Sequence, residues 1–443
     1  MERTQIRAGI WTLGCKVNQY ESQAIAEELT RAGFLVVPTG RACDLYVINT
    51  CTVTAESDRK ARQFIRRAIA RNPEAKIIVT GCLAQTSADM LAAIEGVHAV
   101  VGNGKKMEVV SEALRLFDSK ETEESVRISV SSLDNVPFEP MRITFFDRTR
   151  AYVKIEDGCE NHCTYCIIPH ARGSVRSKAP EDVIDEVTAL TQNGCREIVL
   201  TGIETASYGK DLSGVDLVSL LEKIDKIPGI GQIRLGSLDP SLIRPAFVER
   251  IAKLSSLAPH FHLSLQSGSN RVLAKMKRKY NREMAMDAIR RLREAIPTVE
   301  FTTDVIVGFP GEAEEDFEDT VRFVEEARFL QVHIFPYSKR KGTAAALMED
   351  QIPGEVKRSR LHRLETVTAQ IRKERLQDVI ANRPHQQVLF ETYENGYAYG
   401  HTPGFLEVAV PTPCPLHGQT ATVVLTETDG IHCFGTLEEL HGI

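Results

Sequence analysis

The sequence predicts an α/β protein with three parts: an N-terminal parallel α/β domain, a central partial barrel of six βα units, and a small all-β barrel at the C-terminus. Two observations predict this architecture. Over residues 1–375, short apolar runs alternate with helical patterns, which is typical of parallel sheets covered by helices. Over residues 376–443, short apolar runs are separated by Asn-Gly, Pro-Gly, His-Gly and Asp-Gly turns, which indicates a small β unit.

The N-terminal domain is expected at residues 1–117. Its strands are expected at 6–13, 45–48, 76–79 and 98–101, and its helices at 19–32, 55–70 and from about residue 87. Residues 118–144 are polar, rich in serine and nearly free of periodicity, so we expect them to form a linker.

The central domain is expected at residues 145–375. Its strands are expected at 152–155, 197–201, 232–236, 260–265, 300–307 and 331–335. Helical patterns follow the first five strands, at 181–193, 215–225, 243–254, 281–295 and 313–329. Six βα units are fewer than the eight of a closed barrel, so we expect a partial barrel.

The C-terminal domain is expected at residues 376–443, after a basic helix over 354–377. Its strands are expected at 388–392, 397–401, 406–410, 421–426 and 433–435.

Composition places the chain among ordinary globular proteins. Hydrophobic residues make up 42% and charged residues 26%, which excludes a mainly disordered chain. No stretch approaches the roughly 20 apolar residues of a membrane-spanning helix, and the N-terminus lacks the apolar core of a signal peptide. We therefore expect a cytoplasmic protein without a membrane partner. In a reducing compartment, patterned cysteines more often bind metal or react chemically than form disulfides. The ten cysteines of this chain are therefore informative.

The formal net charge of −6 hides an uneven distribution. Residues 376–443 contain eight acidic residues and one basic residue, so this part carries −7 and the rest of the chain +1. Such an acidic domain is an unusual clamp for nucleic acid. Three basic stretches elsewhere are candidates for phosphate contacts or are solvated surface: Arg59, Lys60, Arg62, Arg66 and Arg67; Arg271, Lys275, Lys277, Arg278 and Lys279; and Lys339, Arg340 and Lys341.

The clearest motif is a triplet of cysteines, Cys159, Cys163 and Cys166, just after a predicted strand. Three thiolates in eight residues can converge on one metal site. A cubane iron–sulfur cluster normally takes four thiolates, so three would leave one iron open to another ligand. A zinc ion with His162 or His170 as a fourth ligand is the alternative.

A second triplet, Cys15, Cys51 and Cys82, is spread along the chain. Each cysteine lies one to three residues beyond the end of a predicted parallel strand, and the carboxyl ends of such strands share one edge. Each also precedes a helix, whose N-terminus favours a thiolate. The three can therefore meet, although unrelated buried cysteines are the alternative. The other cysteines are assigned to packing or surface: Cys43, Cys195, Cys414 and Cys433.

The first triplet, with Tyr165 before its last cysteine, resembles the signature of the radical S-adenosylmethionine (SAM) superfamily. With the second triplet, and with the segments CIIPHARGSVRS, LTGIETASYG, LSLQSGSNRVLAKMKRKY, TDVIVGFPGE and FPYSKRKGTAAA, the whole chain resembles the radical SAM methylthiotransferases. The resemblance implies two 4Fe–4S clusters. One, on Cys159, Cys163 and Cys166, binds SAM and is catalytic, and an auxiliary one is held by Cys15, Cys51 and Cys82. It also implies a radical SAM barrel and a C-terminal TRAM domain.

Contacts to SAM are expected where polar or small residues stand near the predicted strand ends of the barrel. Any one of these residues could instead serve only the local turn. The expected cofactor-binding residues are Tyr165, Thr201, Gly202, Ser237, Gln266 and Asp304.

The opening segment TLGCKVNQYES most resembles the bacterial branch that inserts a methylthio group at carbon 2 of N6-threonylcarbamoyladenosine, at position 37 of tRNA. The branches acting on isopentenyladenosine or on a ribosomal-protein aspartate begin differently, and Lys16 fits neither. Methylthiolation of isopentenyladenosine in tRNA or of a ribosomal-protein aspartate is the alternative within the family. The resemblance implies binding of the tRNA anticodon stem-loop, and an electron donor such as a flavodoxin or ferredoxin. Aromatic residues that could stack on unpaired bases, or form the core of the last domain, are Tyr393, Tyr397, Tyr399 and Phe405. A non-catalytic iron–sulfur or zinc protein that binds RNA is the alternative of a different class.

Overall fold

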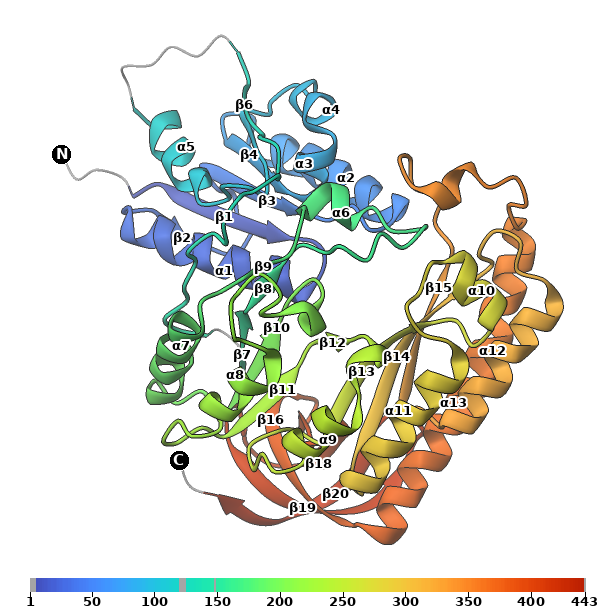
Figure 1. Ribbon diagram of the computed structural model, residues 1–443. Helices are drawn as coiled ribbons and strands as arrows, with labels where there is room; N and C mark the ends of the chain where they lie inside the picture. The colour runs from blue at the N-terminus through green and yellow to red at the C-terminus, as the bar shows by residue number, and fades with distance from the viewer. Residues whose placement is uncertain (1–4, 119–124, 147–148, 442–443) are drawn as a thin grey trace.

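The computed structural model describes residues 5–118, 125–146 and 149–441. It confirms the predicted α/β class: a parallel sheet at the N-terminus, a partial barrel in the centre and a small β-barrel at the C-terminus. In Figure 1 the N-terminal sheet lies at one end of the central barrel, and the C-terminal barrel lies at the other.

The N-terminal sheet has six parallel strands in the order β2-β1-β3-β4-β5-β6. The strands are β1 Arg7–Thr12, β2 Leu35–Val36, β3 Leu45–Thr50, β4 Lys76–Gly81, β5 Ala99–Val101 and β6 Arg127–Ser129. The helices are α1 Lys16–Arg31, α2 Ala55–Arg71, α3 Cys82–Thr86, α4 Ala88–Ala92 and α5 Glu108–Leu116. Apolar side chains of α1 and α5 cover one face of the sheet, and those of α2, α3 and α4 cover the other. Because both faces are covered, every residue of β3 is buried.

Strand β6 lies in the segment 118–144, which the sequence predicts to be a linker. It pairs with β5 and so extends the N-terminal sheet. Residues 119–124 of that segment lie outside the described part of the chain.

The central barrel contains two parallel sheets, β11-β10-β7 and β12-β13-β14-β15. The strands are β7 Arg150–Lys154, β10 Glu197–Thr201, β11 Gln232–Leu235, β12 Ser237–Leu238, β13 His260–Gln266, β14 Glu300–Val307 and β15 Gln331–Pro336. The covering helices are α7 Pro180–Gln192, α8 Leu217–Ile224, α9 Pro245–Ile251, α11 Arg282–Ala295 and α12 Glu314–Ala327. Shorter elements are β8 Glu156–Asp157, β9 Arg176–Ser177, α6 Ile168–Arg172, α10 Asn270–Lys275, η1 Thr205–Ser207, η2 Pro240–Leu242 and η3 Ala344–Leu347. Within the described residues, β7 and β15 do not pair, so the barrel is partial, as predicted.

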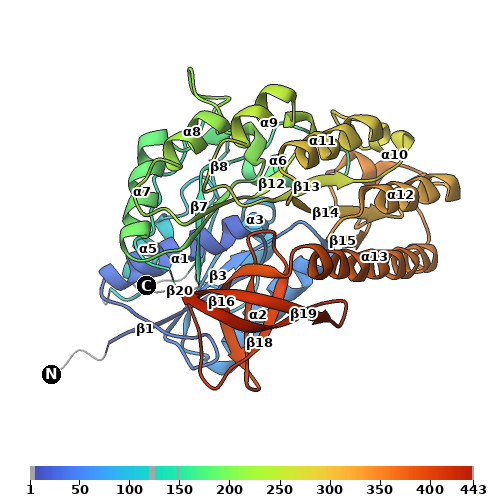
Figure 2. The same ribbon diagram turned by 90° about the horizontal axis from the view of Figure 1, so that it is seen from below.

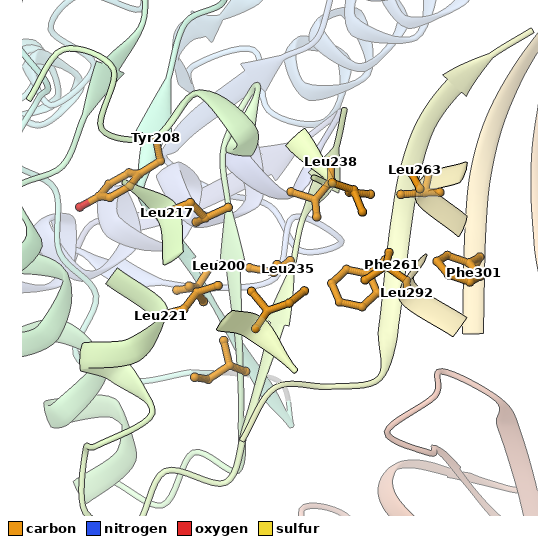
Figure 3. Packing of buried hydrophobic residues seen from close by; sticks show 14 of the residues in the cluster. Leu200, Tyr208, Leu217, Leu221, Leu235, Leu238, Phe261, Leu263, Leu292 and Phe301 are labelled. Carbon is orange, nitrogen blue, oxygen red and sulfur yellow. The ribbon is translucent and has the colours of Figure 1, made fainter. Parts of the chain in front are cut away.

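The main core lies between these strands and the covering helices. Figure 3 shows Leu217 and Leu221 of α8 near strand residues such as Leu200. Each fully buried side chain of this kind contributes about 1.5–3 kcal/mol. Because strand residues alternate between two faces, burying Phe261 and Leu263 against the helices turns the intervening residues of β13 toward the barrel interior.

The C-terminal strands form a closed barrel in the order β16-β17-β18-β20-β19 (Figure 2). They are β16 His385–Glu394, β17 Tyr397–His401, β18 Glu407–Pro411, β19 Thr420–Thr428 and β20 Cys433–His441. The preceding helix, α13 Gly354–Asn382, packs on β15 and α12 and crosses the boundary expected after residue 375.

Several of the acidic and aromatic residues of the C-terminal barrel serve to dock it on the central barrel. Glu391 pairs with Arg150 at the start of β7. The Phe405 ring stacks between His260 and His401, at centroid distances of 4.6 Å and 4.9 Å. Both faces of the Phe405 ring are therefore covered by internal contacts, and Phe405 cannot stack on a base.

No helix in the described part of the chain combines the length and the apolar character that a membrane crossing requires.

Candidate cluster and cofactor site

The three cysteines of the N-terminal domain lie at one edge of its sheet, as predicted. Cys51 and Cys82 directly follow Thr50 and Gly81, which pair with each other at the ends of β3 and β4. Cys15 stands at the N-terminus of α1, beyond the end of the neighbouring strand β1. The order and pairing of the strands thus place the three cysteines at the same carboxyl edge of the sheet.

Close packing holds this edge together. A Cβ added to Gly14 would lie 2.9 Å from the Cβ of Cys51, so the loop carrying Cys15 contacts Cys51 directly. Burial, followed by the nearby Cys82, raises the pKa of Cys51 to about 12, although the amide of Val53 donates to its sulfur at 3.4 Å. Burial keeps such thiols protonated while no metal is bound, and coordination to an iron ion removes the proton. The donor set therefore fits an iron–sulfur cluster.

Gly81 gives a first testable prediction. Its φ is +98°, and a Cβ there would lie 2.3 Å from the carbonyl oxygen of Thr50. Gly81→Ala should push β3 from β4 beside Cys51 and Cys82, adding a clash to the positive-φ strain of about 1–2 kcal/mol. We expect a lower melting temperature and reduced iron per protein after anaerobic reconstitution.

The matched control is Gly33→Ala. Gly33 has a φ of +94°, and a Cβ there would meet nothing within 4 Å, so this variant carries the backbone strain alone. Equal iron content in the two variants would contradict the proposed importance of packing at this edge.

A buried arginine of the central domain reaches the N-terminal cysteines. Arg172, at the end of α6, is fully buried and its Nε donates to Cys82 Sγ at 3.2 Å. Its terminal nitrogens donate to Asn18 and Glu21 of α1 and to Asp157. Since α6 begins two residues after Cys166, the helix that follows the first triplet contacts a cysteine of the second.

The surrounding charges form a buried network. Lys154 donates to Glu21 at 2.8 Å and pairs with Asp157 at 2.7 Å, and Lys106 also pairs with Glu21. Burial opposes ionisation of Glu21, but Arg172, Lys106 and Lys154 outweigh it and hold the pKa of this carboxyl well below its usual range. The network fixes the N-terminal sheet against the barrel through charged groups that are each paired.

The loop with the first cysteine triplet lies between β8 and α6. Gly158 begins it with a φ of +86°, and a Cβ there would lie 1.9 Å from the carbonyl oxygen of Ser174. The amide of Cys166 then donates to the carbonyl of Cys163 at 3.0 Å, which closes a turn. Only glycine fits the first position, so the direction in which Cys159 enters the loop is fixed.

A second arginine contacts this triplet. Arg278 donates to Cys163 Sγ at 3.3 Å, and Asp239 accepts from its other terminal nitrogen at 3.0 Å. Burial raises the pKa of Cys159 to about 12 and that of Cys166 to about 11. Each triplet therefore has one guanidinium that donates to one cysteine sulfur, a contact that influences the potential of iron–sulfur clusters.

Two buried carboxyl groups lie beside this loop. Glu204 accepts from Asn161 at 2.8 Å, and burial, followed by the charge of Asp239, raises its pKa to about 7. Glu156 accepts from the amide of Glu204 at 2.8 Å, and burial raises its pKa well above the usual value. They stand between the cysteine loop and the strand ends where SAM contacts are expected.

Three of the expected SAM contacts stand at or next to the carboxyl ends of barrel strands: Thr201, Gly202 and Gln266. Ser237 begins the short strand β12, two residues after the end of β11. Tyr165 packs against an apolar cluster that includes Phe309 and Tyr337. Asp304 lies in the middle of β14, where it contacts His262 at 3.2 Å. Binding of SAM by these six residues stays a prediction.

A single metal ion fits neither triplet. Within the described residues, the one set of three donors lying within 4.8 Å of one another is His262, Asp304 and His333. His162 and His170 thus complete no compact zinc site with the cysteines. Wider spacing suits a cluster of several irons, which supports the iron–sulfur interpretation over zinc.

Two of the three basic stretches lie side by side near Cys51. Arg340 donates to Asp58 of α2 at 2.7 Å and to Thr52 at 2.6 Å. The amide of Ala55 donates to Ser338 at 3.1 Å. Together these contacts place the 339–341 stretch beside the start of α2.

The remaining basic stretch has internal partners. Arg271 and Lys275 pair with carboxylates, and Arg278 is buried against Cys163. The guanidinium of Arg278 is therefore occupied by these contacts and cannot bind a phosphate. From the sequence, Arg278 is a candidate phosphate contact, and the sequence pattern assigns no role to Arg172 and Glu204, although they lie within the segments CIIPHARGSVRS and LTGIETASYG. Their contacts span 90 and 43 residues of sequence, which no local pattern reveals.

Comparison with known proteins agrees with this geometry. The radical SAM superfamily matches residues 153–324, and a family described as uncharacterized protein family UPF0004 matches residues 7–102. Among solved structures, the radical SAM methyltransferase TsrM from Kitasatospora setae aligns over 78% of this chain and 74% of its own, with a TM-score of 0.56. At 15% identity, that likeness shows the fold alone.

Curated relatives cover most of the chain. The threonylcarbamoyladenosine tRNA methylthiotransferase MtaB of Bacillus subtilis is 42% identical over 403 residues, covering 90% of this chain and 88% of its own length. The MtaB of Thermotoga maritima is 42% identical, covering 80% and 79%. A tRNA-2-methylthio-N(6)-dimethylallyladenosine synthase of Desulfitobacterium hafniense is 32% identical, covering 98% of each chain. With both cysteine triplets in place, these relatives show that the chain belongs to the radical SAM methylthiotransferases.

Proposed function

We propose that this enzyme transfers a methylthio group to carbon 2 of N6-threonylcarbamoyladenosine at position 37 of tRNA. The observation that carries the proposal is the contact of Arg172 with Cys82, since Arg172 belongs to the helix α6 that follows the loop of Cys159, Cys163 and Cys166. The relatives named for this substrate match at 36% to 42% identity, against 32% to 36% for those named dimethylallyladenosine synthases.

The cofactors of the family are two 4Fe–4S clusters and SAM. We assign one cluster to Cys159, Cys163 and Cys166 and the other to Cys15, Cys51 and Cys82. When bound, these groups supply the radical that attacks an unreactive carbon–hydrogen bond, and the sulfur that replaces the hydrogen. The protein contributes the positions of the thiols, the exclusion of water by burial, and charge from the two guanidinium groups. An electron donor such as a flavodoxin or ferredoxin would provide the electrons.

We also propose a separate role for each domain. Residues 1–117 hold the auxiliary cluster, 145–375 hold SAM and its cluster, and 376–443 form a TRAM domain. The pairing of Glu391 with Arg150 supports a positioning role for this last domain and leaves tRNA binding to basic surfaces elsewhere.

The surface for the anticodon stem is proposed on α2 and the adjoining 339–341 stretch. Arg59, Arg62, Arg66 and Arg67 line a shallow hollow of about 500 Å³ on α2. Among the described residues, Arg62, Arg66 and Arg67 form no ion pair, so their charges are free for phosphate, unlike that of Arg59, which pairs with Glu56.

Replacing Arg62, Arg66 and Arg67 together by glutamine should weaken tRNA binding. If each contacts one phosphate, the slope of log affinity against log salt concentration should fall by about 2 to 3. Fluorescence anisotropy with an anticodon stem-loop at several salt concentrations measures this. Arg290, Arg322 and Arg363 are exposed arginines on helices that cover the barrel, and each pairs with a carboxylate. Their triple replacement by glutamine makes the same change in net charge and should change tRNA binding little. Unchanged slopes for the α2 variant would place the tRNA elsewhere.

The function itself is tested with purified protein, reconstituted anaerobically with iron and sulfide and supplied with SAM and a reductant. tRNA carrying N6-threonylcarbamoyladenosine should gain a methylthio group, and tRNA carrying isopentenyladenosine should react far more slowly. Zinc without sulfide in the native protein would instead support a non-catalytic RNA-binding protein.

A further inference from the structure

Three side chains of a kind that ligates metals meet on the sheet of the central barrel, outside both cysteine triplets. They are His262 of β13, Asp304 of β14 and His333 of β15, and their donor atoms all lie within 4.8 Å of one another. The three strands are neighbours in one parallel sheet (Figure 1). Asp304 pairs with His333 in the strand register, and His262 pairs with Thr302, which faces the same side as Asp304. The sheet thus presents one donor from each of three adjacent strands on one face.

The spacing of these donors suits a single ion. Ligand atoms that each lie about 2.0–2.2 Å from one metal ion are about 3–3.5 Å from one another. His262 Nε2 and Asp304 Oδ2 are 3.2 Å apart, so two of the three donors already stand at that separation. His333 is exposed, so its ring is free to turn by the small amount that completes the set.

A buried hydroxyl of the same sheet orients the His262 ring. Thr302 Oγ1 lies 2.9 Å from His262 Nδ1, and the Thr302 side chain is buried. A histidine that ligates a metal through one ring nitrogen almost always forms a hydrogen bond through the other. The contact with Thr302 therefore leaves Nε2, the nitrogen beside Asp304, to the ion.

The third donor, His333, has no competing partner. Its ring lies 5.9 Å from the His262 ring, and within the described residues it forms no hydrogen bond or ion pair. Val332 and Ile334 on either side of it pack against the core, so His333 stands on the opposite face of β15. Its exposure provides an entry path for an ion and leaves coordination positions open to water or a ligand.

The chemistry of the donors indicates the class of ion. Two imidazoles and one carboxylate suit divalent first-row transition metals such as Fe²⁺, Mn²⁺ and Zn²⁺. Mg²⁺ and Ca²⁺ instead take oxygen ligands. A hydrogen bond between His262 and Asp304 without an ion is the competing arrangement, and it would not account for the third donor, His333.

We propose that His262, Asp304 and His333 bind one divalent transition-metal ion, as a third metal site in addition to the two cysteine triplets. Asp304 stands in the middle of β14, away from the carboxyl ends of the strands where SAM contacts are expected. In this assignment Asp304 ligates the ion, and SAM relies on the other expected residues. The site goes beyond the proposed function, because it needs neither SAM nor tRNA to form.

The test is a titration of the reconstituted and desalted enzyme with Mn²⁺, in which unbound Mn²⁺ is measured by electron paramagnetic resonance. Iron and sulfide analysis of the same samples counts any Fe²⁺ that already occupies the site. The wild type should hold one ion, Mn²⁺ or Fe²⁺, beyond the irons that its sulfide content accounts for. His262→Ala, Asp304→Asn and His333→Ala should each weaken Mn²⁺ binding by about tenfold or more. Thr302→Val, which removes the hydroxyl that orients His262, should also weaken it by about tenfold or more.

His432→Ala is the matched control. His432 also lies 3.2 Å from a carboxylate, that of Asp429, but among the described residues it belongs to no set of three close donors, so this variant should bind Mn²⁺ as the wild type does. As a second measurement, Mn²⁺ should raise the melting temperature of the wild type and of His432→Ala, but not that of His333→Ala. Absence of the additional ion from the wild type, or equal Mn²⁺ binding by the wild type and His333→Ala, would overturn the metal site.

Discussion

Replacement of Cys51 by alanine is expected to abolish methylthiolation of tRNA while cleavage of SAM continues. Cys51 lies at the edge of the N-terminal sheet beside Cys82, whereas Cys159, Cys163 and Cys166 occupy a loop of the central barrel. Removing one of the three thiols that we propose as ligands should prevent the auxiliary cluster from forming, and methylthiolation should fall by more than about 100-fold. Formation of 5′-deoxyadenosine from SAM should stay within about twofold, because the barrel triplet is intact.

The comparison variants make this result specific. Cys43→Ala alters a buried cysteine of the same domain that belongs to neither triplet, and should leave both reactions unchanged. Cys163→Ala should abolish both. Normal methylthiolation by the Cys51→Ala protein would show that the N-terminal triplet holds no cluster required for the reaction.

Arg172→Ala should have the largest effect on stability. The substitution removes a fully buried guanidinium from Glu21, Asp157 and Cys82 at once. Breaking a buried ion pair from one side costs about 3–5 kcal/mol, because the partner charges stay buried. We expect a clearly lower melting temperature and loss of the auxiliary cluster, measured by calorimetry and by iron and sulfide analysis.

A further variant separates charge from hydrogen bonding at this position, and a second, at an exposed arginine, is the control. Arg172→Lys keeps a positive charge near Glu21 but cannot reproduce the fork of donors, so it should recover part of the stability. If the auxiliary cluster forms in this variant, its midpoint potential should be lower than in the wild type, since a donor to the sulfur of Cys82 stabilises the reduced cluster. Arg290→Ala, which breaks an exposed pair, should cost no more than about 1 kcal/mol. Wild-type stability in Arg172→Ala would contradict the structural role of the network.

The strand pattern of the barrel could be predicted closely because its signals are local. The strand expected at 300–307 is observed at those residues, and the strand expected at 197–201 likewise. The convergence of Cys15, Cys51 and Cys82 followed from the rule that parallel strands share a carboxyl edge. Strand β6 was not expected, since three residues at a sheet edge produce no readable periodicity.

Long-range partners could not be predicted from the same patterns. Arg278 stands in a basic stretch, and only the fold reveals that it turns inward to Cys163, 115 residues away. The acidity of the C-terminal domain argues against tRNA binding by this domain. In the structure, two of its acidic residues, Glu391 and Glu407, pair with arginines of other segments. Phe405 was a candidate for stacking on a base and instead stacks on His260 and His401.

The most direct test of the central claim is nucleoside mass spectrometry of tRNA from cells with and without this protein. Loss of the protein should remove the 2-methylthio form of N6-threonylcarbamoyladenosine and increase the form without sulfur. The methylthio form of isopentenyladenosine should not change. An unchanged level of methylthio-threonylcarbamoyladenosine in cells that lack the protein would contradict the account.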